Sequence, residues 1–493
     1  MTAPASQKHS VRRQEHGLYN VVVIGGGTAG LVTAAGTAGL GGKVALIERN
    51  LMGGDCLNFG CVPSKALISS ARLVHQIRHA STWGLTKTEP AFDFAEVMQR
   101  MRARRAQIAP NDSRERFESL GVRVIQGEAK FVSPHEIEVE GERLRARNFV
   151  IATGSRATIP KIKGIADVPY FTNETIFDKL RKPPGSMIVL GGGPIGCELG
   201  QTFARLGVKV TLVHNGAHLL PPEDEEVGEF LKARLEGEGV KVCLSARVES
   251  ATQKGDRTTL TFADGTTKST EILLLAVGRT PNLRTLDLAS AEVAHDEHGV
   301  TVNEYLQTSQ RHIYAAGDIA NRLKFTHTAD ASARVVVRNI LMPLQLLRQK
   351  VNWSIVPWCT YTDPEIAHVG LGEREARKKG VEFTVFRVEL KDVDRAIVED
   401  EVAGFAKILV KKGSDEILGA AIVGPHAGDL IHEFVVAMHA KVGLGKLAGM
   451  IHAYPTLAEM ARKAGDQFNK TRLTPRAQKI FAWLYRRARR GSS

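Results

Sequence analysis

Apolar runs that end in glycine-rich turns recur along this chain. The first begins with the unbroken apolar residues 21–24 in NVVVIGGGTAGLVTAAGTAGLGGKVALIER. Such a run is typical of a strand that is covered on both faces of a parallel sheet. A glycine turn, a helix of small residues and a second apolar strand follow, so the segment predicts a β-α-β unit.

The glycine turn of this unit has the spacing of a dinucleotide site. Gly25, Gly27 and Gly30 form G-x-G-x-x-G. The first glycine permits a tight turn, the second lets a pyrophosphate approach the backbone, and the third lets helix and strand pack closely. Glu48 ends the second strand, where a carboxylate can accept hydrogen bonds from ribose hydroxyls.

The same unit returns in MIVLGGGPIGCELGQTFARLGVKVTLVHNG. Its turn contains Gly191, Gly193 and Gly196, and its second strand ends in His214 and Asn215 instead of an acid. Two such folds imply two dinucleotides, and a flavin with a nicotinamide is the natural pair. The alternative is a duplicated fold in which one site is inactive.

Further apolar strands predict how the chain divides. Residues 148–160 and 271–282 each read as a strand that breaks at a glycine, as expected where a chain crosses between domains, and residues 312–320 read as another buried strand. From about residue 351 the glycine turns stop. Alternating segments such as FAKILV and ILGAAIVG, followed by two helices, predict a last domain without a nucleotide signature.

Length and cysteine content favour a multidomain cytosolic protein. The 493 residues exceed what one core can hold, and five cysteines in that length exclude a secreted disulfide framework. No window approaches the ~18–20 apolar residues of a membrane span. Residues 1–18 read as a flexible tail rather than a signal peptide, so we expect a cytoplasmic location.

Much of the net charge of +13 lies in a basic C-terminal tail, residues 471–493. This tail has no acid, and its arginines are interleaved with apolar and aromatic residues. Three interpretations stay open: a helix packed on its own subunit or dimer mate, a basic amphipathic helix in peripheral contact with an anionic membrane, and nucleic-acid binding. No nucleic-acid-binding module accompanies the charge, so no specific nucleic-acid partner is expected.

Cys56 and Cys61, in GGDCLNFGCVPSKAL, carry the candidate chemistry. Zinc ligation would need partners such as His75 and His79, which follow at i, i+4 spacing, but a zinc finger is an isolated module and this segment continues directly from a dinucleotide fold. A structural disulfide is out of place in a reducing cytosol. We therefore interpret the pair as redox-active and expect no structural metal.

The predicted local structure supports that interpretation. Pro63 suits the first turn of a helix that starts near Cys61. A thiolate there is stabilised by unpaired N–H groups and the helix dipole, so the pKa of Cys61 should lie below the free value of ~8.5. A disulfide across so short a loop should be strained and reducible. Lys65 adds positive charge one turn into the helix.

Together these segments resemble the flavin disulfide oxidoreductases, which include dihydrolipoamide dehydrogenase, glutathione reductase and mercuric reductase. GGDCLNFGCVPSKAL is similar to their active-site segment, and ATGS, GGGPIGCELG, AVGRTPN, IYAAGD and YPTLAE occur in the family's order. The resemblance implies an α/β fold with two Rossmann-like dinucleotide-binding domains and a C-terminal α+β dimerisation domain. The FAD domain would comprise 19–156 and 284–350, the NAD(P) domain 157–283, and the homodimer interface 351–470.

Carried over by position, the resemblance implies that electrons pass from NAD(P)H through FAD to the cysteine pair. Cys61 would lie near the flavin, Cys56 would meet the substrate, and Lys65 would pair with Glu198 behind the flavin ring. The implied FAD residues are Gly25, Gly27, Gly30, Glu48, Gly54, Lys65, Ala129, Thr153, Gly154, Asp318, Thr326 and His327. The implied NAD(P) residues are Gly191, Gly193, Gly196, Glu198, His214 and Gly278.

The substrate side departs from the family. Members that act on disulfides use the histidine and glutamate of H-P-T-x-x-E as acid and base, but here IHAYPTLAE keeps Glu459 and has Tyr454 at the histidine position. A phenol with an ordinary pKa of ~10 is a poor match to proton transfer near pH 7. His452 would compensate only if the local backbone differs. Lipoamide and glutathione are therefore disfavoured as substrates.

A thiophilic metal ion such as Hg(II) needs no such base, because Cys56 and Cys61 could hold it transiently as thiolates. The chain looks closest to mercuric-reductase-like proteins, although their C-terminal cysteine pair has no counterpart here. The remaining cysteines, Cys197, Cys243 and Cys359, read as core or helix positions. The expected acceptor is a metal ion or another small oxidant. The alternatives are a dihydrolipoamide-dehydrogenase-like or quinone reductase, and a basic-tailed binding protein with an inactive flavin fold.

The choice between NADPH and NADH depends on the end of the second β-α-β unit. Relatives that prefer NAD carry an acid where His214 stands, and its absence removes a repulsion against a 2′-phosphate. His214, Asn215 and His218 could contact such a phosphate. The sequence therefore favours NADPH slightly over NADH.

Overall fold

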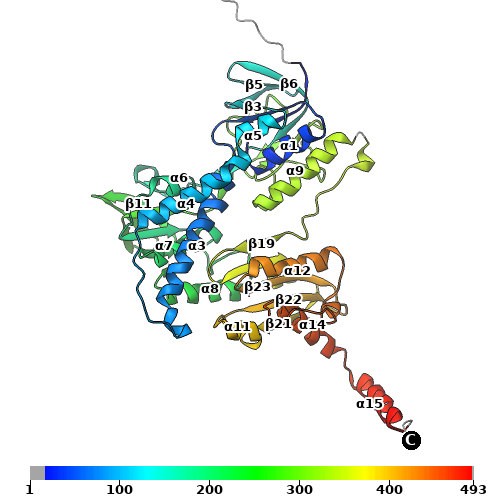
Figure 1. Cartoon of the computed structure of the whole chain (residues 1–493). Helices are drawn as coiled ribbons and strands as arrows, with labels where there is room; N and C mark the ends of the chain where they lie inside the picture. The colour runs from blue at the N-terminus through cyan, green and yellow to red at the C-terminus, as the bar shows by residue number, and fades with distance from the viewer. Residues whose placement is uncertain (1–16, 343, 491–493) are drawn as a thin grey trace, which may run out of the picture. The chain divides into compact units, whose positions relative to one another are not determined.

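The computed structural model describes residues 17–342 and 344–490, and the chain divides into two compact units (Figure 1). The first unit contains the chain up to residue 56 with residues 108–155 and 280–351. The second contains residues 57–107, 156–279 and 352 to the C-terminus. Of the expected N-terminal tail, residues 1–16 lie outside the described residues, as do residues 491–493 of the basic tail. The division into three domains is finer than these units and stays a prediction.

A seven-stranded sheet forms the centre of the first unit, in the order β3-β2-β1-β6-β5-β4 with β18 also paired to β6. Strands β1, β2, β3 and β18 run parallel to their neighbours, whereas β4, β5 and the start of β6 pair antiparallel. The strand bounds are β1 Tyr19–Ile24, β2 Val44–Glu48, β3 Val122–Gln126, β4 Ala129–Ser133, β5 Glu136–Val139, β6 Glu142–Ile151 and β18 Ile313–Ala315.

Both faces of strand β1 are buried, as its unbroken apolar run predicts. Val21 and Val23 belong to the core on one face, and Val22 and Ile24 belong to the core on the other. Helices α1 (Thr28–Gly39) and α9 (Thr326–Leu341) lie side by side over the first of these cores (Figure 1). The parallel strands therefore end together at one edge of the sheet, next to the first glycine turn.

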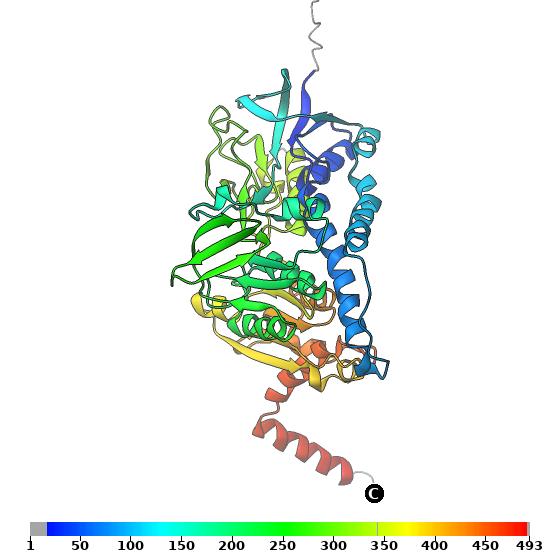
Figure 2. The same cartoon turned by 90° about the vertical axis from the view of Figure 1, so that its left-hand side faces the viewer.

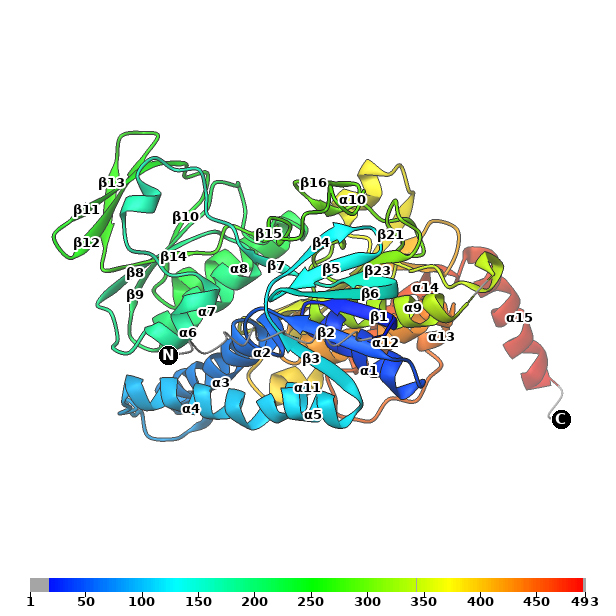
Figure 3. The ribbon, with the colours of Figure 1, turned by 90° about the horizontal axis from the view of Figure 1, so that it is seen from above.

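The second unit contains the second β-α-β fold. Its parallel sheet has the order β10-β9-β8-β14, and a separate antiparallel sheet has the order β11-β12-β13 (Figure 3). The strands are β8 Ser186–Leu190, β9 Lys209–Val213, β10 Lys241–Cys243, β11 Val248–Lys254, β12 Arg257–Phe262, β13 Thr267–Thr270 and β14 Ile272–Leu275; the helices are α7 Pro194–Arg205 and α8 Glu225–Gly237. Helix α3 (Cys61–Arg78) packs along α7.

The last part of this unit is a five-stranded antiparallel sheet in the order β19-β20-β23-β22-β21, with α12 packed on β20 and β23. The strands are β19 Pro357–Thr360, β20 Glu365–Gly370, β21 Phe383–Glu389, β22 Phe405–Lys411 and β23 Ile417–Gly424; the helices are α12 Ala427–His439, α13 Leu444–Leu447, α14 Glu459–Thr471 and α15 Pro475–Arg490 (Figure 2, red). The predicted α/β fold class is confirmed. No helix among the described residues is long and apolar enough to cross a bilayer.

Candidate active site

The first glycine turn leaves no room for side chains. Gly25 has a φ of +111°, and a Cβ on it would come within 2.3 Å of the Ala152 carbonyl oxygen. A Cβ on Gly30 would come within 1.8 Å of the Gly25 carbonyl oxygen. Glycine is therefore required at both positions, so that the strand can turn sharply and the helix can lie close to it.

Glu48, at the end of β2, braces the same turn. Its Oε2 accepts a hydrogen bond of 2.6 Å from the Gly26 N–H, and its Oε1 accepts one of 2.7 Å from the Asn50 N–H. The carboxylate is buried beside the glycines. It therefore lies at the end of the second strand, where a dinucleotide fold places the acid that faces a ribose.

Gly54 and Ala129 are two further residues of the first unit that the resemblance implies for FAD. Gly54 lies against the turn, since a Cβ on it would come within 2.6 Å of the Gly27 Cα. Ala129 is buried at the start of β4. The backbone around Gly27 is thus enclosed by glycines, which gives a close-fitting cradle for a pyrophosphate.

The residues after β6 are held together by polar side chains. Asp318 accepts a hydrogen bond of 2.6 Å from Ser155 Oγ. Asn282 Nδ2 donates to the Thr153 carbonyl oxygen at 2.9 Å, and the Asn282 N–H donates to the Gly154 carbonyl oxygen at 3.0 Å. The structure thus brings Thr153, Gly154 and Asp318 together, and it adds Ser155 and Asn282, which the sequence analysis had not identified.

Thr326 and His327 form the first turn of α9. Thr326 is half-buried, His327 is exposed, and the His327 ring stacks on Phe325 with ring centroids 5.2 Å apart. The first glycine turn, Glu48 and the hydrogen-bonded residues around Asp318 together fit FAD in the first unit. The role of these two residues in holding it stays a prediction.

The second glycine turn repeats the first. Gly191 has a φ of +125°, and a Cβ on it would come within 2.2 Å of the Ala276 carbonyl oxygen. A Cβ on Gly196 would come within 1.9 Å of the Gly191 carbonyl oxygen. Gly193 is the N-cap residue of α7, and a Cβ on it would meet no atom within 4 Å. The Gly278 carbonyl oxygen accepts a hydrogen bond of 3.0 Å from the Thr158 N–H. The turn fits a second dinucleotide in the second unit.

His214 occupies the position that Glu48 has in the first repeat. The Gly192 N–H donates to His214 Nδ1 at 3.3 Å. This bond spans 22 residues, as does the bond from the Gly26 N–H to Glu48 in the first repeat. The bond from Gly192 assigns the proton of the neutral ring to Nε2, which is buried without a partner among the described residues. Burial, and then the neighbouring His218, lower the pKa of His214. The position therefore offers neither the acid that favours NADH nor a cation for a 2′-phosphate.

Replacing His214 with glutamate should move the nucleotide preference toward NADH by about tenfold in the ratio of kcat/KM values, because the new carboxylate can accept ribose hydroxyls and repels a 2′-phosphate. Steady-state kinetics with both nucleotides measure the ratio. His214→Gln is the matched control, since it adds no charge and should leave the ratio within about twofold. An unchanged ratio in His214→Glu would show that this position does not contact the nucleotide.

The two cysteines lie at helix starts, as predicted for Cys61. Cys56 is half-buried in the short helix α2 (Gly54–Asn58), and Cys61 is the exposed first residue of α3. Pro63 is in the first turn of α3. The N-terminus of this helix therefore presents the Cys61 sulfur to solvent next to N–H groups that lack intrahelical acceptors.

A partly buried ion pair lies one turn further along α3. Lys65 Nζ bonds Glu198 Oε2 of α7 at 2.8 Å, and Glu198 is only 5% exposed. The Tyr361 N–H donates to Glu198 Oε1 at 2.9 Å, and the Lys65 ammonium lies 4.4 Å from the centre of the Tyr361 ring. Lys65 is thus held by a carboxylate and by an aromatic face.

The sequence analysis did not identify Tyr361, which follows β19 in the segment CTYTDPEIAHVG. Burial, followed by the charges of Cys359, Glu365, Glu198 and Cys61, raises the pKa of Tyr361 to about 12. Its hydroxyl therefore stays protonated at neutral pH. Lys65 and Tyr361 also line a cavity of about 710 Å³ beside α3.

In the segment IHAYPTLAE, where disulfide-reducing relatives have their acid and base, Tyr454 and His452 both bond neighbouring residues. The Tyr454 hydroxyl donates to Asp394 Oδ2 at 2.9 Å, and this bond raises the pKa of Tyr454. His452 Nε2 lies 2.9 Å from Glu433 Oε1, and its Nδ1 lies 3.1 Å from the Met450 carbonyl oxygen. Both ring nitrogens of His452 are therefore engaged.

Glu459 is buried at the start of α14. Its Oε1 bonds Arg462 at 2.7 Å, and its Oε2 is buried without a hydrogen-bond partner among the described residues. The Tyr454 hydroxyl bonds Asp394 rather than Glu459. The structure thus keeps the glutamate expected at this position but does not couple it to the tyrosine through a hydrogen bond.

The zinc interpretation gains no support from His75 and His79. Their rings lie 4.1 Å apart, and His75 Nε2 lies 3.5 Å from a guanidinium nitrogen of Arg234. Burial and the charge of Arg205 lower the pKa of His75 to about 4. A cationic neighbour at the ring nitrogen opposes a metal ion there.

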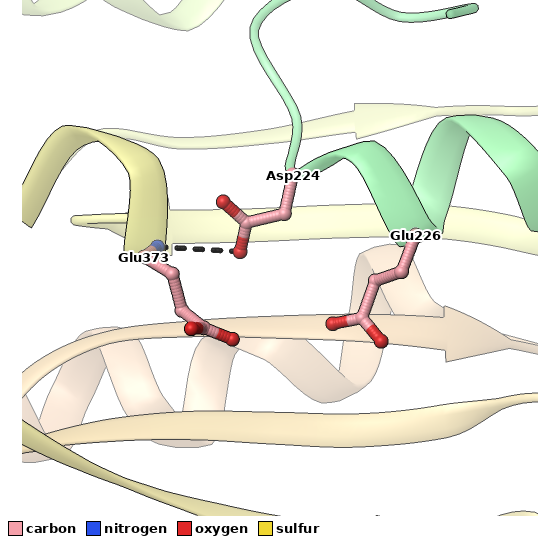
Figure 4. Close-up of side chains that lie close together, drawn as sticks. All are labelled: Asp224, Glu226 and Glu373. Atoms are coloured by element: carbon pink, nitrogen blue, oxygen red, sulfur yellow. Dashed lines mark hydrogen bonds between the residues drawn. The ribbon is translucent and has the colours of Figure 1, made fainter. Parts of the chain in front are cut away.

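One cluster of three carboxylates, Asp224, Glu226 and Glu373, comes close enough to share a metal ion (Figure 4). The Lys407 ammonium already lies among its carboxylates. Its Nζ lies 2.6 Å from Asp224 Oδ2 and 3.1 Å from Glu373 Oε1, and it also bonds Glu226. Burial opposes the charged amine, but these partners raise the pKa of Lys407. The cluster is therefore an ion-pair network.

The other three cysteines lie in half-buried or buried positions. Cys197 is fully buried in α7, and burial raises its pKa. Burial, and then the charge of Glu365, raise the pKa of Cys359 in β19. Cys243 is half-buried at the end of β10. Cys197 lies in a core, and Cys243 and Cys359 pack against the edges of two others; the raised pKa values of Cys197 and Cys359 disfavour a reactive thiolate at those two positions.

Comparison with known proteins finds one family that matches both the nucleotide-binding part and the C-terminal part of the chain. Residues 19–333 match the family described as pyridine nucleotide-disulphide oxidoreductase, and residues 356–464 match the dimerisation domain of that family. Mercuric reductase of Bacillus cereus is 34% identical over 456 residues, which cover 92% of this chain and 72% of that protein. Dihydrolipoyl dehydrogenase of Chlamydia muridarum is 33% identical over 447 residues, which cover 90% of this chain and 95% of that protein.

Solved structures share the fold over nearly the whole chain. The HOCl-induced flavoprotein disulfide reductase RclA from Escherichia coli aligns with a TM-score of 0.81 and 27% identity, covering 90% of this chain and 99% of that one. A Cu(II) complex of the same protein aligns with a TM-score of 0.82 and 26% identity, covering 92% and 99%.

The matched dimerisation domain indicates a homodimer. The family is FAD-dependent and takes its electrons from NAD(P)H. Since one family match spans residues 19–333 of the 493, the chain belongs to the pyridine nucleotide-disulphide oxidoreductase family.

Proposed function

We propose that this enzyme uses NAD(P)H to reduce a thiophilic metal ion such as Hg(II), with Cys56 and Cys61 as the redox-active pair. The observation that favours a metal ion as the acceptor is the hydrogen bonding of the loop around Tyr454. Its tyrosine hydroxyl donates to Asp394, and both nitrogens of His452 are engaged. At the position of the expected histidine, this loop therefore has a phenol that holds its proton at neutral pH instead of a group that exchanges one.

The chemical requirement differs between the two classes of acceptor. Cleaving a disulfide substrate releases a thiolate that must take up a proton, and an acid with a pKa near the working pH accelerates this step. The pKa of Tyr454 is raised by its bond to Asp394, so its proton is held more tightly than in a free phenol. A metal ion exchanges thiolate ligands without such an acid.

The residues of this chain have distinct proposed roles. Cys56 receives the metal ion from solution, and Cys61 holds it as the second thiolate. Glu198 and Tyr361 orient Lys65, which keeps a positive charge close to the start of α3. When bound, FAD supplies the two-electron exchange between the nicotinamide and the cysteine pair. NAD(P)H gives up two electrons, and Hg(II) takes up two to leave as Hg(0).

The names of similar proteins support a metal acceptor. Mercuric reductases of Bacillus cereus and Staphylococcus aureus are 34% and 33% identical to this chain. RclA has been solved in complex with Cu(II). Dihydrolipoyl dehydrogenases match at nearly the same identity, so lipoamide reduction is the alternative that an experiment must separate.

A panel of acceptors with the wild-type enzyme and Tyr454→His separates the two functions. The wild type should oxidise NAD(P)H with Hg(II) in excess thiol and should turn over lipoamide at least about tenfold more slowly. Tyr454→His should raise lipoamide turnover about tenfold, because it adds a group that titrates near neutral pH, and should leave Hg(II) reduction within about twofold. NAD(P)H absorbance measures both rates.

Tyr454→Phe is the matched control, since it removes the bond to Asp394 without adding a titrating group. Both of its rates should stay near those of the wild type. Brisk lipoamide turnover by the wild type, with Hg(II) left unreduced, would reject the proposal in favour of a dihydrolipoamide-dehydrogenase-like function.

A further inference from the structure

The C-terminal helix α15 separates apolar from cationic side chains. The Thr474 hydroxyl accepts a hydrogen bond of 3.3 Å from the Ala477 N–H and so caps its first turn. At about 3.6 residues per turn, residues spaced by three, four, seven and eleven share one face. That face carries Ala477, Ile480, Phe481, Leu484 and Ala488.

This apolar face is open to solvent in the described part of the chain. Ile480 is 58% exposed, Phe481 is 49% exposed and Leu484 is 46% exposed. A helix that packs on the core of a globular domain normally buries such a stripe. The stripe on α15 therefore needs a partner outside this subunit.

The charges identify the kind of partner. Lys479 and Arg486 lie on the side of the helix opposite the stripe, and Arg476 and Arg487 lie at the border of the stripe, four residues before and seven residues after Ile480. No acidic residue follows Asp466 in the sequence, whereas eight cationic residues do: Lys470, Arg472, Arg476, Lys479, Arg486, Arg487, Arg489 and Arg490. A surface that complements this segment must be anionic and must accept apolar side chains.

Aromatic residues flank the cationic side. The Arg487 guanidinium lies 5.6 Å from the centre of the Trp483 ring, and Tyr485 is exposed. Tryptophan and tyrosine favour the boundary between lipid headgroups and acyl chains, where arginine meets phosphate. A contact between the α15 helices of two subunits would instead bring their like charges together.

We propose that α15 lies flat on bilayers that contain anionic phospholipids. The stripe of Ile480, Phe481 and Leu484 enters the boundary of the acyl chains, and the arginines contact headgroup phosphates. The enzyme would then act as a peripheral membrane protein. This inference does not depend on the electron acceptor, because no cysteine or nucleotide residue takes part.

Flotation of the full-length holoenzyme with lipid vesicles tests the inference. Vesicles of phosphatidylcholine with about 30% phosphatidylglycerol should bind the enzyme, and vesicles of phosphatidylcholine alone should bind at least about tenfold less. Raising the salt to ~1 M should release it, because the Debye length falls to about 3 Å. Phe481→Gln with Leu484→Gln should lower binding about tenfold, because the apolar anchor is removed while every charge stays.

The matched control removes exposed apolar side chains elsewhere. Leu85 and Val398 are also exposed, and Leu85→Gln with Val398→Gln should leave binding unchanged. Equal binding to both kinds of vesicle would overturn the proposal, as would binding that the Phe481→Gln, Leu484→Gln variant retains. A loss of dimer in that variant during gel filtration, with no vesicle binding by the wild type, would show that α15 packs on a second copy of this chain.

Discussion

Cys61→Ser should lower NAD(P)H-dependent reduction of every acceptor at least about a thousandfold, while the protein stays folded and yellow. The serine hydroxyl cannot form a disulfide with Cys56, and it does not ionise at neutral pH. Because Cys61 is exposed at the first position of α3, the smaller oxygen leaves no cavity in the core. Steady-state rates and the flavin content of the purified variant measure the two effects.

Cys56→Ser separates the two cysteine roles. This variant should also lose turnover, but its remaining Cys61 thiolate should give long-wavelength charge-transfer absorption with the oxidised flavin before any reductant is added. Cys61→Ser should show no such band. A charge-transfer band in Cys61→Ser but not in Cys56→Ser would reverse the assignment.

Cys359→Ser is the control for these variants. Burial raises the pKa of Cys359, so its thiol should be inert at neutral pH. Its Sγ lies 3.6 Å from the Thr360 carbonyl oxygen, and a serine hydroxyl can make the same contact. The control should keep turnover within about twofold of the wild type.

Lys407→Met should lower the free energy of unfolding by about 3 kcal/mol, because it removes a buried cation that bonds three carboxylates, of which Asp224 and Glu373 are half-buried. The Lys407 side chain is only 3% exposed and bonds Asp224, Glu226 and Glu373. Urea unfolding followed by circular dichroism measures the loss. The residues of this network come from α8, its N-terminal flank, α10 (Glu373–Lys378) and β22, so the loss concerns the packing of the second unit.

Lys411→Met is the matched control on the same strand. Lys411 pairs with Glu416 at 3.3 Å, but the two side chains are 56% and 58% exposed. Such a surface pair contributes at most about 1 kcal/mol. Equal losses in the two variants would show that the buried network has no special role in stability.

The effect of Lys407→Met should shrink in acid. Burial raises the pKa of Asp224 and Glu226, but their bonds to Lys407 help to bring both pKa values below the ordinary range. Their contribution is therefore present above their unfolded pKa values of about 4 and is lost as the pH falls through the folded values. Below that range the carboxylates are protonated, and removing the ammonium costs less. The difference in unfolding free energy between wild type and variant should therefore narrow from pH 7 toward pH 3.

Local signals explain what could be predicted from the sequence. The two glycine turns, the strands before them and the helix that starts at Cys61 each depend on residues within one short segment. Gly30 is required by a contact inside its own turn, with the Gly25 carbonyl oxygen, and the spacing of the glycines together with the flanking strand and helix identifies the β-α-β unit. The replacement at Tyr454 was visible for the same reason, because it changes one position of a compact motif.

The remaining features depend on contacts between distant segments. Tyr361 meets Lys65 and Glu198 only after the C-terminal sheet has packed on α7, and no spacing in the sequence reports this. The segment FAKILV predicts a strand, but it does not predict that its lysine, Lys407, is buried. The burial of Lys407 depends on carboxylates that are distant in the sequence: Glu373 is 34 residues away and Asp224 is 183 residues away. The sequence shows that a histidine, His214, replaces the acid, but only the structure shows that its ring accepts a hydrogen bond from Gly192.

The most direct test of the proposed electron path is thiol trapping at Cys56 and Cys61. The oxidised holoenzyme and the enzyme reduced anaerobically with NAD(P)H are each denatured in iodoacetamide and digested with trypsin. Both cysteines lie in the tryptic peptide 50–65, which mass spectrometry can follow. This peptide should carry a disulfide in the oxidised enzyme and two alkyl groups after reduction, while Cys197, Cys243 and Cys359 should not change. Equal alkylation of peptide 50–65 before and after NAD(P)H would contradict the account.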